Sequence, residues 1–234
     1  MIDFHSHILP NIDDGSKNME ETIELLEEAQ KAGFTKIIST SHYMEQYYEV
    51  TENDRLELIN KIQQQDQRVE ILLGSEIYIT DELVELLKDK KASSINNSKY
   101  VLFELPLNVK EIGAKEVVYR LIENDYIPII AHPERYSYVQ QDINYIEELT
   151  QMGALLQANY GSIIGMYGSK AEKTVKKLLK NNSIQFLGSD VHRPGQVYEK
   201  MPKIIKKLKK IIPEDKLEEL TTLNPQKVLN NEDI

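Results

Sequence analysis

Short apolar runs alternate with longer amphipathic segments from one end of the chain to the other. The apolar runs predict β-strands at Ile2–Phe4, Lys36–Thr40, Glu70–Gly74, Tyr100–Leu105, Ile127–Ala131, Ala154–Ala158 and Ile184–Gly188. They are apolar on both faces, as expected for parallel strands that are covered on both sides. The amphipathic segments predict helices at Met19–Ala32, Asn53–Gln65, Asp81–Lys88, Ile112–Asn124, Ile143–Met152 and Ser169–Asn181.

This alternation, with no change of composition along the chain, predicts a single α/β domain over residues 1–234. We expect a distorted seven-unit (β/α) barrel of the TIM type. An open doubly wound sheet is the alternative, and the absence of a Gly-x-Gly-x-x-Gly run argues against it. At 234 residues the chain is long enough to bury a substantial core.

All five histidines lie at or just after the ends of predicted strands. They are His5, His7, His42, His132 and His192. Parallel barrels carry their chemistry at the C-terminal ends of the strands, and neutral imidazole is a common metal ligand. Residues i and i+2 of an extended segment point to the same side, so His5 and His7 can reach one cation. We therefore expect the histidines to converge on one metal site.

Carboxylates occupy similar positions. Glu76 follows an apolar strand, Glu104 lies within one, and Asp190 precedes His192 by two residues. A carboxylate in such apolar surroundings is costly unless it is paired or binds a metal. A buried ion pair, or an edge strand facing water, is the alternative for Glu76 and Glu104. Asp13 and Asp14 lie in an Asp-Gly turn, and Asp14 is the preferred ligand, although the sequence barely separates the two.

Five histidines with Asp14, Glu76, Glu104 and Asp190 exceed the ligands that a single ion accepts. They suit two or three ions with bridging carboxylates, and nitrogen and oxygen ligands without thiolate favour Mn²⁺, Fe²⁺ or Zn²⁺. Such ions would attract a phosphate dianion and lower the pKa of a bound water. The chain has no cysteine, which excludes disulfides, a thiolate zinc site and a cysteine nucleophile.

Two arginines lie close to these histidines in the sequence. Arg135 belongs to the run His-Pro-Glu-Arg-Tyr that starts at His132, and Arg193 directly follows His192. Arginine near a histidine-rich site is suited to hold a phosphate by bidentate contacts. A surface salt bridge is the alternative for Arg135.

Charge and hydropathy limit the possible partners and location. A net charge of −10 argues against a general nucleic-acid-binding protein. No apolar run approaches the roughly 18 residues that span a bilayer, and no signal peptide is evident, so we expect a cytoplasmic protein without membrane insertion. The segment Lys200–Lys210 predicts a basic amphipathic helix, either simply solvated or docking on an acidic partner or membrane. The oligomeric state is left open.

Taken in order, the motifs resemble those of a known superfamily. The runs IDFHSHILPNIDDG, TSHY, GSEIY, FELP, AHPERY and GSDVH resemble the PHP (polymerase and histidinol phosphatase) superfamily. More closely, the chain resembles the manganese-dependent protein-tyrosine phosphatases of capsule and exopolysaccharide operons in Gram-positive bacteria. The resemblance covers nearly the whole chain and includes all nine candidate ligands.

The resemblance implies a distorted seven-unit barrel with three metal ions, normally manganese, and a tyrosine-rich tail of a bacterial tyrosine kinase as substrate. It implies that one ion is held by His5, His7, Glu76 and Asp190. A second would be held by Glu76, Glu104 and His132, and a third by Asp14, His42 and His192. Arg135 matches a phosphate-contacting arginine, whereas Arg193 lies in a less fixed stretch. Loop tyrosines could receive the substrate ring, namely Tyr43, Tyr47, Tyr48, Tyr160 and Tyr167.

Three other functions are compatible with parts of the pattern. A metal-dependent amidohydrolase also begins with His-x-His, but it commonly bridges its metals with a modified lysine where this chain offers Glu76 and Glu104. A PHP phosphoesterase could instead act on a small metabolite such as histidinol phosphate. A non-catalytic PHP scaffold is the third alternative, and the complete ligand set argues against it.

Overall fold

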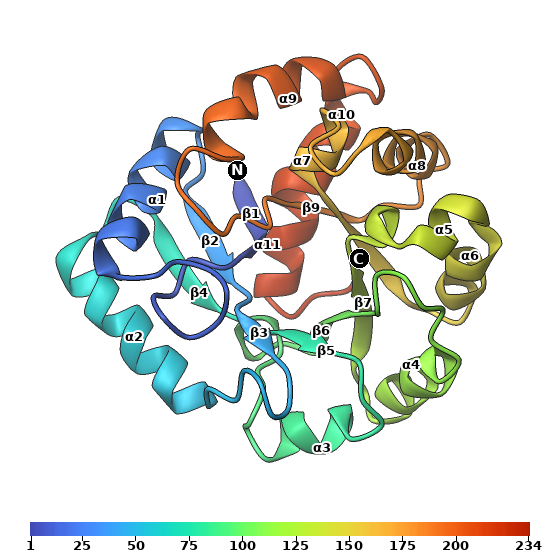
Figure 1. Cartoon of the computed structure of the whole chain (residues 1–234), viewed down its shortest axis with the longest axis horizontal. Coiled ribbons are helices and arrows are strands. Elements are labelled where there is room, and N and C mark those ends of the chain that lie inside the picture. The colour runs from blue at the N-terminus through green and yellow to red at the C-terminus, as the bar shows by residue number, and fades with distance from the viewer.

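Parallel strands curl inside a ring of helices in the computed structural model, which describes all 234 residues (Figure 1). The strands are β1 (Ile2–Ser6), β2 (Lys36–Ser39), β3 (His42–Tyr43), β4 (Glu70–Leu73), β5 (Glu76–Tyr78), β6 (Tyr100–Glu104), β7 (Ile127–Ala131), β8 (Leu155–Asn159) and β9 (Phe186–Gly188). The main helices are α1 (Met19–Lys31), α2 (Glu52–Gln65), α3 (Leu83–Lys88), α4 (Ala114–Glu123), α5 (Ser137–Gln141), α6 (Asn144–Gln151), α7 (Tyr160–Ile163), α8 (Ser169–Lys180), α9 (Met201–Leu208), α10 (Glu214–Glu218) and α11 (Asn224–Leu229). Short helical turns complete the chain at η1 (Ile95–Asn97), η2 (Pro133–Arg135), η3 (Tyr198–Lys200) and η4 (Glu219–Leu223).

The strands form two parallel sheets, with the orders β1-β2-β4 and β3-β5-β6-β7-β8-β9. The second and third predicted strands form as β2 and β4. Each is followed by a further short strand, β3 or β5, that the pattern did not predict, and the backbone leaves the ladder between them at Thr40–Ser41 and at Gly74–Ser75. Hydrogen bonds continue across these breaks, from Thr40 N to Ser6 O at 2.8 Å and from Glu76 N to Thr40 O at 2.9 Å. The α/β class and the parallel strands are confirmed, in two curled sheets.

The first and last strands lie side by side. Asp190 N donates to His5 O at 2.7 Å, and His7 N donates to Val191 O at 3.0 Å. Ser6 and Val191 form an isolated parallel bridge. Because of these bonds, the residues that follow β1 and β9 reach the same place from opposite ends of the chain.

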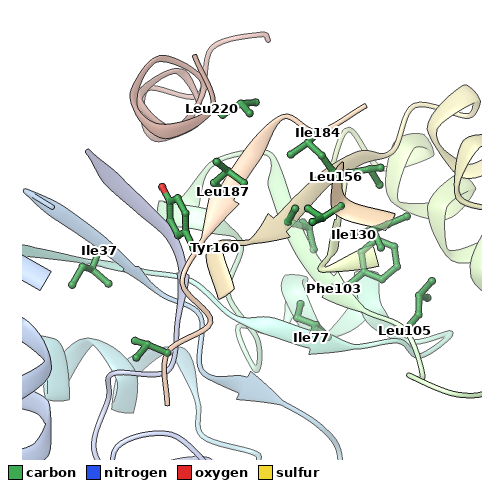
Figure 2. Close-up of a cluster of buried hydrophobic side chains, with 14 of the residues drawn as sticks. Ile37, Ile77, Phe103, Leu105, Ile130, Leu156, Tyr160, Ile184, Leu187 and Leu220 are labelled. Atoms are coloured by element: carbon green, nitrogen blue, oxygen red, sulfur yellow. The ribbon is translucent and has the colours of Figure 1, made fainter. Parts of the chain in front are cut away.

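Apolar side chains fill both sides of the curled sheets. A smaller cluster inside the curl includes Ile2, Phe4, Ile38, Leu102 and Phe186 and is completed by Val228 of α11. Figure 1 shows α11 in the middle of the ring. The rings of Phe4 and Phe186 stack with centroids 4.0 Å apart. Alternate residues of the same strands face outward into a larger cluster beneath the helices, which is shown in part in Figure 2 and includes Ile37, Phe103, Ile130, Leu156 and Leu187.

The predicted basic helix forms as α9. Met201, Ile204 and Leu208 are buried against the rest of the molecule, so its apolar side is already covered. Lys207 Nζ bonds Glu172 Oε1 of α8 at 2.6 Å and links the two helices. None of the helices has the length and apolar character that crossing a bilayer requires.

Candidate metal centre

His5 and His7 point their Nε2 atoms at the same small space. These atoms lie 3.1 Å apart, and they lie 3.1 and 3.2 Å from Glu76 Oε2. Asp190 Oδ1 approaches the same two nitrogens at 3.6 and 3.4 Å. All four residues are buried and form one group of potential ligands. These are the same four residues that the resemblance assigns to one ion.

A second group of potential ligands adjoins the first and shares His7 with it. It consists of His7, Asp14, His42 and His192. Asp14 Oδ1 lies 3.6 Å from His42 Nε2 and 3.3 Å from His192 Nε2. The rings of His7 and His192 stack with centroids 4.1 Å apart. Asp14 is the most exposed member, so this group faces solvent while the first does not.

A third group contains His42, Glu76 and Glu104. His42 Nδ1 lies 3.3 Å from both Glu76 Oε2 and Glu104 Oε1. His132 Nε2 contacts the other Glu76 oxygen at 2.8 Å and lies 4.0 Å from Glu104 Oε2. The resemblance placed His132 with these two glutamates. The structure places His132 beside them and brings His42 close to them as well.

The nine candidates therefore form one continuous centre in which Glu76 touches two of the three groups. The hydrogen bonds show that its histidines are oriented to accept a cation. His5 Nδ1 faces the oxygen of Gln157, and His7 Nδ1 faces Asp13 Oδ2, each at 2.8 Å. These contacts favour the tautomers that carry hydrogen on Nδ1, which leaves both Nε2 atoms available to a cation. This donor set fits divalent metal ions, because a cation satisfies the lone pairs and the carboxylates together.

Charges within the centre shift several pKa values strongly. Burial alone would raise the pKa of Glu76, but His5, His42 and His132 hold it well below the usual range. Burial and the neighbouring Glu76 and Asp190 carboxylates raise the pKa of Glu104 well above its usual range. Burial lowers the pKa of His42 to about 4, so this ring is neutral and able to ligate at neutral pH.

Two of the candidates have backbone angles that are uncommon outside glycine. His132 has φ 31° and Asp190 has φ 53°, both in the left-handed region. Such conformations cost free energy and are frequent at functional sites. They turn the chain sharply at the ends of β7 and β9. Gly188 lets the end of β9 lie close to β1, because a Cβ atom at this position would lie 2.4 Å from His5 Cβ.

The structure adds supporting residues that sequence reasoning missed. Gln157 and Asn159 project from β8, and Asn159 Nδ2 donates to Asp190 Oδ2 at 2.6 Å. Gln157 Nε2 donates to Asn159 Oδ1 at 3.0 Å, so the two amides connect His5 to Asp190. Polar residues alternating within the otherwise apolar run Leu155–Asn159 were the available signal. Asp13, set aside in favour of Asp14, supports His7 and accepts a bond from His42 N at 2.9 Å.

Arg55 of α2 is a further missed residue. It is fully buried and donates to Ser41 O at 2.7 Å, His42 O at 2.8 Å and Val50 O at 3.0 Å. These bonds hold the backbone on both sides of β3. Arg55 therefore fixes the segment that carries His42, a role that its place in an amphipathic helix does not reveal.

The two predicted arginines have different surroundings. Arg135 Nη1 lies 2.5 Å from Asp190 Oδ2, and its guanidinium lies 4.6 Å from the centre of the Tyr167 ring. Arg135 therefore borders the candidate ligand groups and is partly exposed. Arg193 bonds the backbone oxygens of Gly15 and His192. It joins the loops that carry Asp14 and His192.

The five tyrosines proposed as a wall for the substrate fall into two sets. Tyr43 and Tyr160 are buried, because their strand and helix positions turn them inward. Tyr47 is 73% exposed at the tip of a turn. Tyr48 stacks on His42 with centroids 5.8 Å apart, and Tyr167 lies against Arg135.

Comparison with known protein families assigns the chain to one of them. The family described as "Capsular polysaccharide synthesis, CpsB/CapC" matches residues 1–230. The chain belongs to the CpsB/CapC family. It is 37% identical to the CapC protein of Staphylococcus aureus over 196 residues, covering 82% of this chain and 77% of that protein. It is 28% identical to the tyrosine-protein phosphatase CpsB of Streptococcus agalactiae over 244 residues, covering 99% of each.

Solved structures agree with this membership of the CpsB/CapC family. A structure from work on YwqE of Bacillus subtilis and CpsB of Streptococcus pneumoniae, described as unique metal-dependent tyrosine phosphatases, superposes with a TM-score of 0.90. It is 30% identical, and the match covers all of this chain and 96% of that one. A histidinol phosphate phosphatase of Lactococcus lactis superposes with a TM-score of 0.58 at 16% identity, over 90% of this chain and 93% of that one, and shares the fold.

Proposed function

We propose that this chain is a metal-dependent protein-tyrosine phosphatase. The observation that carries the proposal is the continuous centre of five histidines and four carboxylates beside Arg135, in a member of the CpsB/CapC family. Relatives in that family are named tyrosine-protein phosphatases. The absence of cysteine excludes the thiolate chemistry used by other phosphatases of phosphotyrosine.

The ligands are assigned to three ions, with Mn²⁺ as the expected metal and Fe²⁺ or Zn²⁺ as alternatives. His5, His7, Glu76 and Asp190 would hold the buried ion. Glu76, Glu104 and His132 would hold the second, and Asp14, His42 and His192 the third, which faces solvent. When bound, such ions lower the pKa of water and withdraw negative charge from a phosphate group.

Protein residues supply the remaining elements of the reaction. Arg135 is partly exposed beside the centre and offers guanidinium hydrogens to phosphate oxygens, so its role is to bind and orient the phosphate. Arg193 is assigned a lesser role in holding the loop of Asp14. Gln157 and Asp13 fix the imidazoles of His5 and His7. A phenolate leaving group, with a pKa near 10 for the free phenol, needs little help from a protein acid.

The relatives and the resemblance also suggest the biological setting. The substrate would be a phosphorylated, tyrosine-rich tail of a bacterial tyrosine kinase that regulates capsule or exopolysaccharide synthesis. A flexible tail can enter an open site without unfolding a domain. We place the enzyme in the cytoplasm, where such a tail would be reached.

We also propose that the two sheets together make a distorted seven-unit barrel. The bonds between His5 and Asp190 and between His7 and Val191 support this arrangement, because they connect the first strand to the last. The offset of the short strands β3 and β5 from β2 and β4 would be the distortion. It places His42 and Glu76 opposite each other in register at the start of β3 and β5.

The proposed activity is tested by substrate competition. Purified protein loaded with Mn²⁺ is assayed on a phosphotyrosine peptide, a phosphoserine peptide and histidinol phosphate. We expect the largest kcat/KM on the phosphotyrosine peptide. A preference for histidinol phosphate would move the chain to metabolite hydrolysis, and no hydrolysis of any of the three would refute the proposal.

A further inference from the structure

A cavity of about 300 Å³ opens directly onto the metal centre. Two candidate ligands, His42 and Glu104, form part of its wall, and each has 15% of its side chain exposed. The rest of the wall is mainly apolar or aromatic and includes Met44, Tyr48, Tyr78, Pro106 and Leu107. Another cavity, of about 500 Å³ and lined in part by α1 and α9, shares no residue with the candidate metal centre.

Residues of three neighbouring strands build this cavity. His42 begins β3, Tyr78 ends β5 and Glu104 ends β6, with Tyr78 and Glu104 paired in register. The segment Pro106–Leu107 follows β6 and forms the far side. The cavity therefore adjoins the same three strands that supply His42, Glu76 and Glu104.

A tight turn after β3 holds the aromatic wall in place. Met44 N donates to Tyr48 O at 2.9 Å, and Tyr48 N donates to Met44 O at 2.8 Å. This pair of bonds folds Tyr48 back over His42, where the two rings lie nearly parallel with an interplanar angle of 18°. Tyr47, one residue earlier, points into solvent. The turn therefore places Tyr48, and not Tyr47, in the wall of the cavity.

We propose that this cavity is an aryl subsite that holds the phenyl ring of phosphotyrosine while its phosphate lies on the metal centre. The inference rests on the proposed function and names the residues that would select the substrate. A cavity of about 150 Å³ is already large enough to bind benzene. Aromatic walls favour a flat ring by stacking or edge contacts, and Leu107 and Met44 supply apolar contact.

The charges around the cavity agree with this orientation of the ligand. The phosphate dianion requires cations, which the proposed metal ions and Arg135 would supply. The outer wall carries no arginine or lysine that would hold a second anion. A phosphorylated serine has no ring and leaves this space unfilled, so the cavity distinguishes aryl from alkyl phosphates by apolar contact.

Leu107 is the most useful residue for a test, because its side chain is 38% exposed and lies outside the ligand set. Its backbone oxygen accepts from Ser137 N at 2.8 Å, a bond that alanine retains. Val109 is a matched control, since it is an aliphatic residue of the same loop, is 68% exposed and does not line the cavity.

The probes are phenylphosphonate and methylphosphonate, which carry the same charged group and are not hydrolysed. Their binding to Mn²⁺-loaded protein is measured by calorimetry. We expect the unaltered protein to bind phenylphosphonate more tightly. Leu107→Ala should weaken phenylphosphonate binding by about ten-fold and leave methylphosphonate unchanged. Val109→Ala should retain the preference of the unaltered protein.

Two results would overturn the aryl subsite. One is equal affinity of the unaltered protein for the two phosphonates. The other is a Leu107→Ala variant that keeps the full preference or loses both probes equally. These binding results are separate from turnover, because failure to hydrolyse phosphotyrosine peptide refutes the proposed function whichever phosphonate binds better.

Discussion

The imidazole of His5 donates from Nδ1 to the amide oxygen of Gln157 over 2.8 Å. An amide oxygen only accepts hydrogen bonds, so the contact selects the His5 tautomer whose Nε2 carries a lone pair. That lone pair faces His7, Glu76 and Asp190. Residues that orient a metal ligand in this way commonly change metal affinity 10- to 100-fold when they are replaced.

Replacement of Gln157 should therefore weaken metal binding without removing a ligand. For Gln157→Leu we expect a loss of Mn²⁺ affinity of about ten-fold or more, because His5 is free to adopt the wrong tautomer. The measurement is equilibrium titration of chelator-treated protein with Mn²⁺. Gln151→Leu, at the exposed end of α6, is the control and should bind Mn²⁺ normally. Unchanged affinity in Gln157→Leu would show that this bond does not orient His5.

Replacing Glu76 and replacing Arg135 should have different effects on bound metal and activity. Glu76 contacts His5, His7, His42 and His132, so Glu76→Ala should lose bound metal and activity together. Arg135→Ala should keep its metal, because Asp190 retains its contacts with His5, His7 and Asn159. Its kcat/KM should fall by about 100-fold, as expected for loss of a group that stabilises transition-state charge.

Metal analysis of the two purified variants, together with their kinetics, separates these roles. Arg135→Lys is the control for charge, and it should recover only part of the activity because lysine cannot make the bidentate contact. A full metal content in Glu76→Ala with a reduced content in Arg135→Ala would reverse the assignments.

The alternation of apolar and amphipathic segments was sufficient to predict the parallel strands and most helices. It did not predict the short strands β3 and β5, because the predicted strands ended at Thr40 and Gly74 and the pattern does not show that the backbone leaves one ladder and joins another at His42 and Glu76. Those departures depend on contacts from β1 and from Arg55, which are distant in sequence.

The nine candidate residues could be selected from the sequence, because histidine and acidic side chains are conspicuous next to apolar strands. The sequence could not reveal the residues that position them. Gln157 and Asn159 are uncharged and resemble ordinary strand residues, and their function appears only when β8 lies beside His5 and Asp190. The tyrosines were harder to assign, since burial of Tyr43 and Tyr160 depends on which way each segment turns.

Acid should weaken the link between α8 and α9. Glu172 Oε1 lies 2.6 Å from both Lys176 Nζ and Lys207 Nζ, and these bonds lower the pKa of Glu172 to about 2. A lowered folded-state pKa means that the link stabilises the fold above the ordinary glutamate value and loses this effect as the pH falls toward 2. Because the lysines are partly exposed, we expect a contribution on the order of 1 kcal/mol or less.

The free energy of unfolding of Glu172→Gln, measured without metal, should therefore lie below that of the unaltered protein at pH 7. The difference should shrink as the pH is lowered from about 4.5 and should also shrink in high salt. Glu57→Gln, on the exposed side of α2, serves as the control. A difference that grows on acidification would contradict the sign of the shift.

The most direct test of the central claim follows activity against bound metal in a single preparation. Chelator-treated protein is titrated with Mn²⁺, and both bound manganese and hydrolysis of a phosphotyrosine peptide are measured at each step, with and without iodoacetamide. We predict no hydrolysis in the metal-free protein, recovery that rises with bound manganese, and no effect of iodoacetamide. Hydrolysis that persists after complete removal of metal would contradict the account.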